Sequence, residues 1–454
     1  MFRFRKLSTS TAIAVAASLS VGSAVLAESA TGSGATFQQN FQASATVAYN
    51  AATGHNVSYA NPGGGSSKGK SDFKANLTDF GGTDSAVTTA QAASFDWVYV
   101  PYVGGAIAIA YRLDELGGAT LSLSPATING IFGGTITNWN DASIANDLKS
   151  NPVWVNSKKK PELKGASAII ENSAPGSAKV TVSAIPSVFK STKGKSVEIV
   201  NQSTKKVVKT AAFSKAEVSM TMAVSEAIKY SVRLAGKEIA VFAETTVTMP
   251  DKPIVVVYRS DGSGTTNNFC NFMRQAANTD WTANDAFTSC IPGGSTKVAS
   301  FGSRYQGQSG SANVSNYVAD NSGTIGYTEV SFVTDAARAA KGMKAANVRN
   351  AAGKYVAPTS AATSSFLSAS TVDAKGFVTF DYKQAANATA YPIVAITYAL
   401  GKTAKSAKNA VVSDYMQWVL NTYGPQNAEA LGYAPLTGAL KDAALAQAKL
   451  INSK

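Results

Sequence analysis

The stretch that decides the fold reads PIVVVYRSDGSGTT and spans residues 253–266. Its apolar first half, 253–258, predicts a buried strand, and the Gly-Ser-Gly-Thr turn leads into a helix-like segment near 266–276. Strands that pass through such turns into helices are typical of α/β proteins. The same unit makes an anion site, because free backbone N–H groups converge at the helix N-terminus and the helix dipole favours negative charge.

The side chains of this turn suit a tetrahedral oxyanion. Ser263 and Thr265 add hydroxyl donors, and Arg259 adds a planar, permanently charged donor. Asp261 is close enough along the chain to hold Arg259 in place. An ordinary capped turn also reads Gly-Ser-Gly-Thr, so it is the arginine directly after the strand that strengthens the prediction.

Three more polar, glycine-rich loops precede this one. The first is 32–37, with Thr36 placed to donate; the second is 61–67; the third is 79–84, where Asp84 ends a strand. Taken singly, each of them is more often a loop than a binding site.

The chain changes character in the middle. Residues 28–154 and the chain from 251 onward mix helix and strand patterns, whereas 155–250 shows short alternating runs, the last of them at 244–249. The middle segment carries 15 Lys and Arg against 7 Asp and Glu, so most of the formal net charge of +13 lies there. We predict an inserted, basic, all-β module with an immunoglobulin-like sandwich as one form of it.

Residues 1–27 predict a signal peptide. A basic start is followed by a short apolar run that ends in small residues, and the alternative, a membrane anchor, needs a longer run. Export makes a disulfide between Cys270 and Cys290 the expectation, with two free buried thiols as the alternative. The lone His55 argues against Ser-His-Asp catalysis and histidine metal sites.

As an ordered set, the four loops resemble the phosphate-binding subunit of the bacterial phosphate ABC importer. Further matches are 128–134 with Trp139, 322–327 and 390–393, and the resemblance covers nearly all of the chain after the signal peptide except 155–250. It implies a two-lobed periplasmic-binding-protein-like fold with hinges near Val103-Gly104 and Tyr391-Pro392. The implied division is 1–27 signal peptide, 28–104 and 392–454 lobe I, 105–154 and 251–391 lobe II, and 155–250 inserted module.

The resemblance also implies the ligand contacts. They come from all four loops: Thr36, Phe37, Ser66, Asp84, Arg259, Asp261, Ser263, Gly264 and Thr265. The 61–67 loop departs from the family pattern, so Ser67 or a backbone N–H of Gly64 or Gly65 stays open beside Ser66. No catalytic residue, metal or cofactor is implied.

The expected function is that of an exported, monomeric phosphate receptor that serves a membrane permease. Other classes stay open: a secreted phosphatase with Ser263 as nucleophile, a surface or adhesive protein, and a receptor for another oxyanion. For 155–250 an anionic envelope surface and a merely solvated domain are both open. Nucleic acid is disfavoured, because few aromatic residues lie among the basic ones.

Overall fold

The computed structural model describes residues 27–116, 119–150, 153–158, 160–174, 177–224, 228–245 and 247–454. The predicted signal peptide, apart from residue 27, lies outside these residues. No helix within the described part of the chain is long and apolar enough to cross a membrane.

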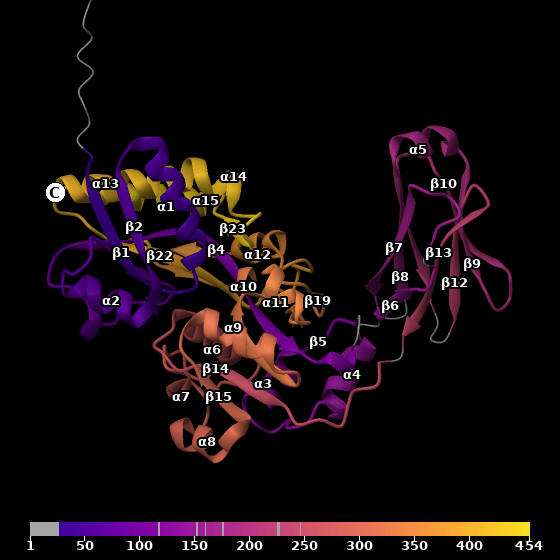
Figure 1. The fold of residues 1–454 in the computed structure, drawn as a ribbon, viewed down its shortest axis with the longest axis horizontal. Coiled ribbons are helices and arrows are strands. Elements are labelled where there is room, and N and C mark those ends of the chain that lie inside the picture. Colours follow the sequence, from indigo (N-terminus) through magenta and orange to yellow (C-terminus); the bar gives the residue numbers. More distant parts are fainter. Residues whose placement is uncertain are drawn as a thin grey trace, which may run out of the picture.

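A ten-stranded sheet runs through the larger part of the molecule (Figure 1). Its strands follow the order β15-β14-β16-β4-β22-β3-β1-β2, and β17 and β23 also pair with β4. Their bounds are β1 Ser29–Gly34, β2 Asn56–Gly64, β3 Phe80–Thr83, β4 Trp97–Arg112, β14 Val255–Arg259, β15 Tyr305–Gln308, β16 Thr324–Glu329, β17 Lys344–Ala345, β22 Val394–Lys402 and β23 Tyr433–Pro435.

Helices cover this sheet, and short strand pairs lie at its margins. The helices are α1 Gln39–Thr53, α2 Ser66–Lys74, α3 Pro125–Phe132, α4 Ala142–Ser150, α6 Gly264–Ala276, α7 Phe287–Cys290, α8 Gly294–Ser300, α9 Gly310–Asp320, α10 Val330–Val333, α11 Ala336–Ala340, α12 Ser360–Leu367, α13 Ala407–Trp418, α14 Gly424–Asn427 and α15 Gly438–Leu450. The marginal strands are β5 Ser122–Leu123, β18 Asn347–Arg349, β19 Tyr355–Val356, β20 Thr371–Val372 and β21 Val378–Thr379.

Strand β4 divides the sheet into two lobes. Its first part pairs with β22 up to Ala106, and its second part pairs with β16 from Ile107 onward. Lobe I is therefore built on β22, β3, β1 and β2, and lobe II on β16, β14 and β15. The partner switch follows directly after the predicted hinge at Val103-Gly104. The second crossing between the lobes, at the predicted hinge Tyr391-Pro392, lies beside this partner switch, because the Tyr391 hydroxyl donates to the Ile107 carbonyl at 2.9 Å.

The apolar runs 97–103 and 106–111 predict two buried strands, but the structure has one, β4. Every residue of β4 is buried except Arg112, which is partly buried, so a single continuous strand can serve the cores of both lobes. The glycine pair at 104–105 fits the close packing here: a Cβ at Gly104 would lie 2.4 Å from Leu367, and one at Gly105 2.7 Å from Phe37.

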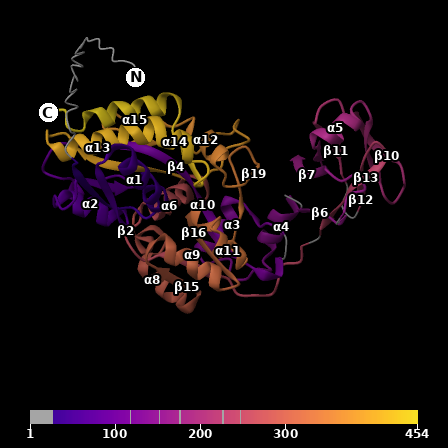
Figure 2. The same ribbon diagram turned by 45° about the horizontal axis from the view of Figure 1, so that its top comes forward.

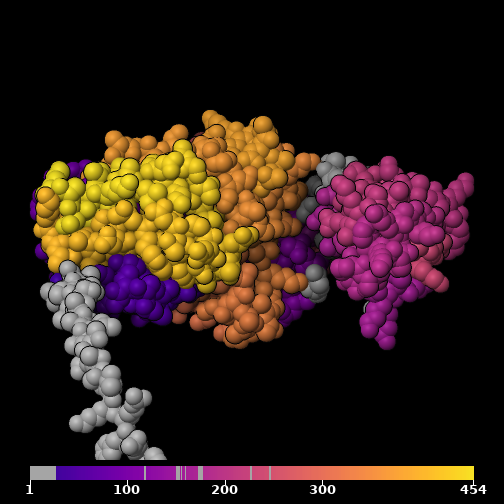
Figure 3. Space-filling view, turned by 90° about the horizontal axis from the view of Figure 1, so that it is seen from above, coloured from indigo at the N-terminus to yellow at the C-terminus, as the bar shows by residue number. Residues whose placement is uncertain are grey.

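Residues 153–245 form two antiparallel sheets with their own apolar core. The larger has the order β10-β9-β12-β13-β6 and the smaller β11-β8-β7. The bounds are β6 Val153–Asn156, β7 Ala166–Ala174, β8 Ser177–Ala184, β9 Ser196–Asn201, β10 Val207–Ala212, β11 Glu217–Ala223, β12 Lys229–Leu234 and β13 Lys237–Thr245. Figure 2 shows these strands beside the two-lobed body and not within it, and Figure 3 shows the same segment as a separate mass next to that body.

Two expectations for this segment need correction. It is not all-β, because Pro186–Thr192 forms helix α5, with a proline in its first turn and Phe189 packed edge-on against Phe213. Of the run 244–249, residues 244 and 245 belong to β13, which ends at Thr245 opposite Val153 of β6, and residues 247–249 lie outside the strands. The boundaries of the segment as an inserted module stay a prediction.

Candidate functional site

Arg259 stands at the end of β14 with only 2% of its surface exposed. Its Nε donates to Asp261 Oδ1 at 2.6 Å, its Nη2 donates to Asp261 Oδ2, and its Nη1 donates to Ser311 Oγ at 3.1 Å. Burial alone would raise the pKa of Asp261, but the hydrogen bonds and charge of Arg259 hold that pKa below its ordinary value. The Asp261 carboxylate therefore holds the Arg259 guanidinium in one orientation.

Helix α6 begins beside this arginine. Ser263 is its N-cap, and its hydroxyl accepts a hydrogen bond from the Thr266 amide at 3.2 Å. Amides of a first helical turn have no acceptor within the helix. The buried Thr265 Oγ1 has no hydrogen-bond partner within the described residues. The first-turn amides of α6 and the Thr265 hydroxyl are therefore donors without acceptors at the turn that the sequence predicts as an anion site.

Lobe I supplies Ser66 and Asp84 to the same point. Ser66 begins α2, is fully buried, and donates to Asp84 Oδ2 at 3.3 Å, while its hydroxyl accepts from the Asp84 amide at 3.1 Å. Gly264 of lobe II touches both: a Cβ there would lie 2.5 Å from Ser66 Oγ and 2.7 Å from Asp84 Cβ. Only glycine fits this approach between the lobes.

Asp84 is the acid that meets Ser66 and Gly264 where the lobes approach each other. Its Oδ1 is buried and has no hydrogen-bond partner within the described residues. Burial raises the pKa of Asp84 to about 7, although the nearby Thr397 hydroxyl, the Arg259 charge and the Ser66 hydroxyl oppose the shift. Near neutral pH this carboxyl group can therefore accept or donate a proton.

The Thr36 side chain belongs to the same group of polar side chains, whereas the Phe37 side chain does not. Thr36 Oγ1 lies 3.0 Å from Ser311 Oγ and accepts from the Ser311 amide at 3.3 Å. The Phe37 ring is buried in the core against Tyr433, whose hydroxyl donates to the Phe37 carbonyl at 2.7 Å. Only the main-chain N–H of Phe37 is left for a ligand.

Two of the alternatives to Ser66 in the 61–67 loop have partners within the protein, and the Gly64 amide stays an open alternative. The Ser67 hydroxyl donates to Asp285 at 3.0 Å, and the Gly65 amide donates to the Gly34 carbonyl at 2.9 Å, so both are already used. Ser66 alone of these faces Asp84.

The sequence reasoning missed two side chains, Ser311 and Glu329. Ser311 links Thr36 to Arg259, and the Ser309-Gly310-Ser311 turn that opens α9 repeats the glycine-serine signal used elsewhere. Burial raises the pKa of Glu329 to about 8, with Ser311 and Arg259 opposing the shift. Glu329 Oε1 has no hydrogen-bond partner within the described part of the chain. Nothing in its local sequence marked it.

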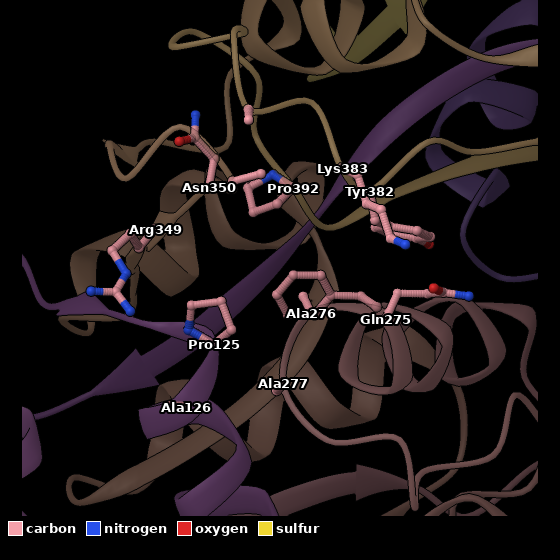
Figure 4. Close-up of a pocket in the computed structure, with 13 residues that line it drawn as sticks. Pro125, Ala126, Gln275, Ala276, Ala277, Arg349, Asn350, Tyr382, Lys383 and Pro392 are labelled. Carbon is pink, nitrogen blue, oxygen red and sulfur yellow. The ribbon is translucent and has the colours of Figure 1, made fainter.

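The predicted disulfide is present between Cys270 of α6 and Cys290 of α7. Within the described residues no group of His, Cys, Asp and Glu side chains is arranged to hold a metal ion. A separate hollow of about 430 Å³ lies near the second crossing, between Pro125, Phe272, Arg349, Tyr382 and Pro392 (Figure 4). It shares no lining residue with the polar cluster.

Known proteins of similar sequence are phosphate-binding proteins. The phosphate-binding protein PstS of Xylella fastidiosa (strain 9a5c) is 23% identical over 411 residues, which cover 89% of this chain and 80% of the relative. The PstS 3 protein of Mycobacterium tuberculosis (strain H37Rv) is 35% identical over 120 residues, 25% of this chain and 31% of its own. These relatives confirm the resemblance that the four loops indicate.

Solved structures share the fold. The crystal structure of a DING protein superposes with a TM-score of 0.56 at 20% identity, covering 92% of this chain and 93% of its own. A high-affinity periplasmic phosphate-binding protein, solved with phosphate bound, gives a TM-score of 0.54 at 19% identity with the same coverage.

The family model described as the PBP superfamily domain matches residues 20–212 and 234–422. The match includes all four loops and both crossings between the lobes. The chain belongs to the PBP superfamily.

Proposed function

We propose that this chain is an exported, high-affinity receptor that encloses one inorganic phosphate ion between its lobes and delivers it to an ABC importer. The observation that carries the proposal is the meeting of a buried, directed arginine, a free helix N-terminus and one buried carboxyl group. The names of the relatives, which are phosphate-binding proteins, support the same ligand.

The chemistry of the donor set fits a tetrahedral anion with four acceptor oxygens. Arg259, the first amides of α6 and the hydroxyls of Thr36, Ser66 and Thr265 are donors. Asp261 holds the arginine, Ser263 caps the helix, and Gly264 and the Phe37 amide offer backbone contacts. We assign these residues as the phosphate site.

Asp84 supplies selectivity. Phosphate near neutral pH still carries a proton, which an ionised Asp84 can accept. Sulfate carries none, so two acceptors of like charge would face each other in a buried place, which costs on the order of a few kcal/mol.

A receptor is supported over a phosphatase by the surroundings of Ser263. Its hydroxyl is engaged as the cap of α6. The chain's only histidine, His55, belongs to lobe I and directly precedes β2. Hydrolysis of a phosphate ester would need a base or a metal at this serine.

We propose that the lobes close about the two crossings, as in hinge closure of other binding proteins. The chain divisions at 28–104, 105–154, 155–250, 251–391 and 392–454 follow from this proposal. The mature protein would act as a monomer in the periplasm or cell envelope after removal of residues 1–27.

For residues 155–250 we propose contact with an anionic envelope surface. The registers of β7, β8, β9, β10 and β11 bring one end of both sheets together at α5, opposite the end where Val153 pairs with Thr245. Exposed lysines gather at this α5 end, namely Lys164, Lys190, Lys193, Lys195 and Lys215. These five cations face away from the attachment to the body, whereas exposed Lys205, Lys206 and Lys229 lie at the opposite end of the sheets.

Binding to anionic vesicles tests that contact. Replacing the five α5-end lysines by Gln should abolish co-sedimentation at low salt, whereas Gln at the exposed Lys405 and Lys449 of lobe I should not. Equal binding by both variants would rule out the α5 end, and binding to an anionic wall polymer but not to vesicles would identify the surface.

Titration calorimetry of the mature protein, stripped of bound ligand, tests the main proposal. We expect tight one-to-one binding of phosphate, no binding of sulfate and no turnover of a chromogenic phosphate ester. A folded, stripped protein that ignores phosphate would refute it, and sulfate or ester activity would point to the alternatives named above.

A further inference from the structure

An ion pair crosses between the lobes next to the phosphate site. Lys70 lies on α2 of lobe I, and Asp285 lies in the loop between α6 and α7 of lobe II. Lys70 Nζ is 2.8 Å from Asp285 Oδ2, and their side chains are only 2% and 13% exposed. The two charges therefore meet almost out of water.

Both groups already have several hydrogen-bond partners within the protein. An ammonium group has three donors, and Lys70 Nζ contacts three acceptors: Asp285, Ser85 Oγ at 3.0 Å and the Ala86 carbonyl at 3.1 Å. Asp285 also accepts from Ser67 Oγ at 3.0 Å and from Asn267 Nδ2 at 3.0 Å. The cluster is complete without phosphate.

The same cluster is joined to the anion-binding elements on both sides. The Ser263 amide, at the cap of α6, donates to the Asp285 carbonyl at 2.9 Å. Ser67, which follows Ser66 at the start of α2, donates its amide to the Gly262 carbonyl at 3.0 Å. Separation of the lobes would break the Lys70–Asp285 and Ser67–Gly262 contacts together, whereas the Ser263–Asp285 bond stays within lobe II.

We infer that Lys70 and Asp285 form a closure latch, which exists only when the lobes are closed and sets how long the phosphate is retained. The inference rests on the proposed function. In an open protein both charges are hydrated; in the closed one, removal of either partner leaves the other charge buried and uncompensated. Such a loss acts mainly on the dissociation rate.

The neighbouring ion pair Lys68–Asp72 differs from the proposed latch, because both of its residues lie on the same helix. Lys68 and Asp72 lie one helical turn apart on α2 at 2.6 Å, and Lys68 is 52% exposed. This pair belongs to one lobe, is present whether the lobes are open or closed, and is screened by water. It is a matched control on the same helix.

Phosphate binding and release by variants test the latch. Lys70→Met should raise the Kd about 10- to 100-fold through faster dissociation, and Lys68→Met should change it less than about twofold. Lys70→Met with Asp285→Leu should bind better than either single variant, because no lone charge stays buried.

A ligand-independent measurement separates this inference from the proposed function. Spin labels on Val47→Cys of α1, which is 68% exposed, and on the exposed Ala299→Cys of α8 report lobe separation, and the described residues contain no free cysteine. Lys70→Met should shift the distances toward the open form with or without phosphate. A wild type that ignores phosphate would refute the receptor; unchanged distances, or equal effects of Lys70→Met and Lys68→Met, would refute the latch.

Discussion

The two lobes contribute opposite chemistry to the site. Lobe II brings a buried cation, Arg259, and the positive end of α6, whereas lobe I brings the hydroxyls of Thr36 and Ser66 and the carboxyl group of Asp84. In the proposed site, the first set would attract any oxyanion, and the second would distinguish an anion that carries a proton from one that does not. Affinity and selectivity would then have separate sources, which mutations can remove separately.

The largest effect is expected from lobe II. Arg259→Met should weaken phosphate binding by at least about a hundredfold, because the charged donor is lost and Asp261 is left buried without its partner. Calorimetry measures the change. Arg274→Met, an exposed arginine near the end of the same helix, should bind like the wild type; a similar loss in both would contradict the role of Arg259.

Asp84→Asn is expected to act on selectivity. An amide can donate to sulfate, so the ratio of sulfate Kd to phosphate Kd should fall about tenfold to a hundredfold. Competition between the two anions gives the ratio, with the exposed Asp96→Asn as control. An unchanged ratio would show that Asp84 of lobe I does not distinguish an anion that carries a proton from one that does not.

The same selectivity should depend on pH. The pKa of Asp84 is raised to about 7, so the group is ionised above this pH and protonated below it. Sulfate should therefore bind weakly at pH 8.5, bind about tenfold better for each pH unit as the pH falls toward 7, and level off below pH 7, where the acid is already protonated and can donate. A sulfate affinity that stays flat from pH 8.5 to 5.5 would exclude titration of Asp84 as the cause.

The smallest of these effects is expected from Ser311, which joins the lobes through Thr36 and Arg259. Ser311→Ala removes neutral hydrogen bonds and should raise the phosphate Kd about fivefold, with selectivity retained. The adjacent Ser309→Ala is the control, because Ser309 makes no side-chain capping bond to α9. A change in selectivity caused by Ser311→Ala would contradict the assignment of selectivity to lobe I, because Ser311 belongs to lobe II.

Groups that are close in sequence were the predictable part of the site. Arg259, Asp261 and Ser263 belong to one strand-turn-helix unit, so local pattern suffices to bring them together. The resemblance to a known family added Thr36, Ser66 and Asp84. The partner relations between distant segments, such as Ser311 with Thr36 and Lys70 with Asp285, depend on how two lobes meet, and no local pattern contains that.

The fold shows the same limit. The α/β texture of the body followed from apolar runs and turns, but the single long β4 did not, because its Gly104-Gly105 reads as a break and is in fact a place of close packing. In 153–245, α5 was missed because seven residues are too short for a helical period to stand out.

The crystal structure of the mature protein with phosphate tests the central claim most directly. We predict one phosphate ion between the lobes, with oxygens within hydrogen-bonding distance of Arg259 and the Gly264 and Thr265 amides, and with Asp84 Oδ1 facing the protonated oxygen. Phosphate bound elsewhere, or bound here with Asp84 turned away, would contradict the account.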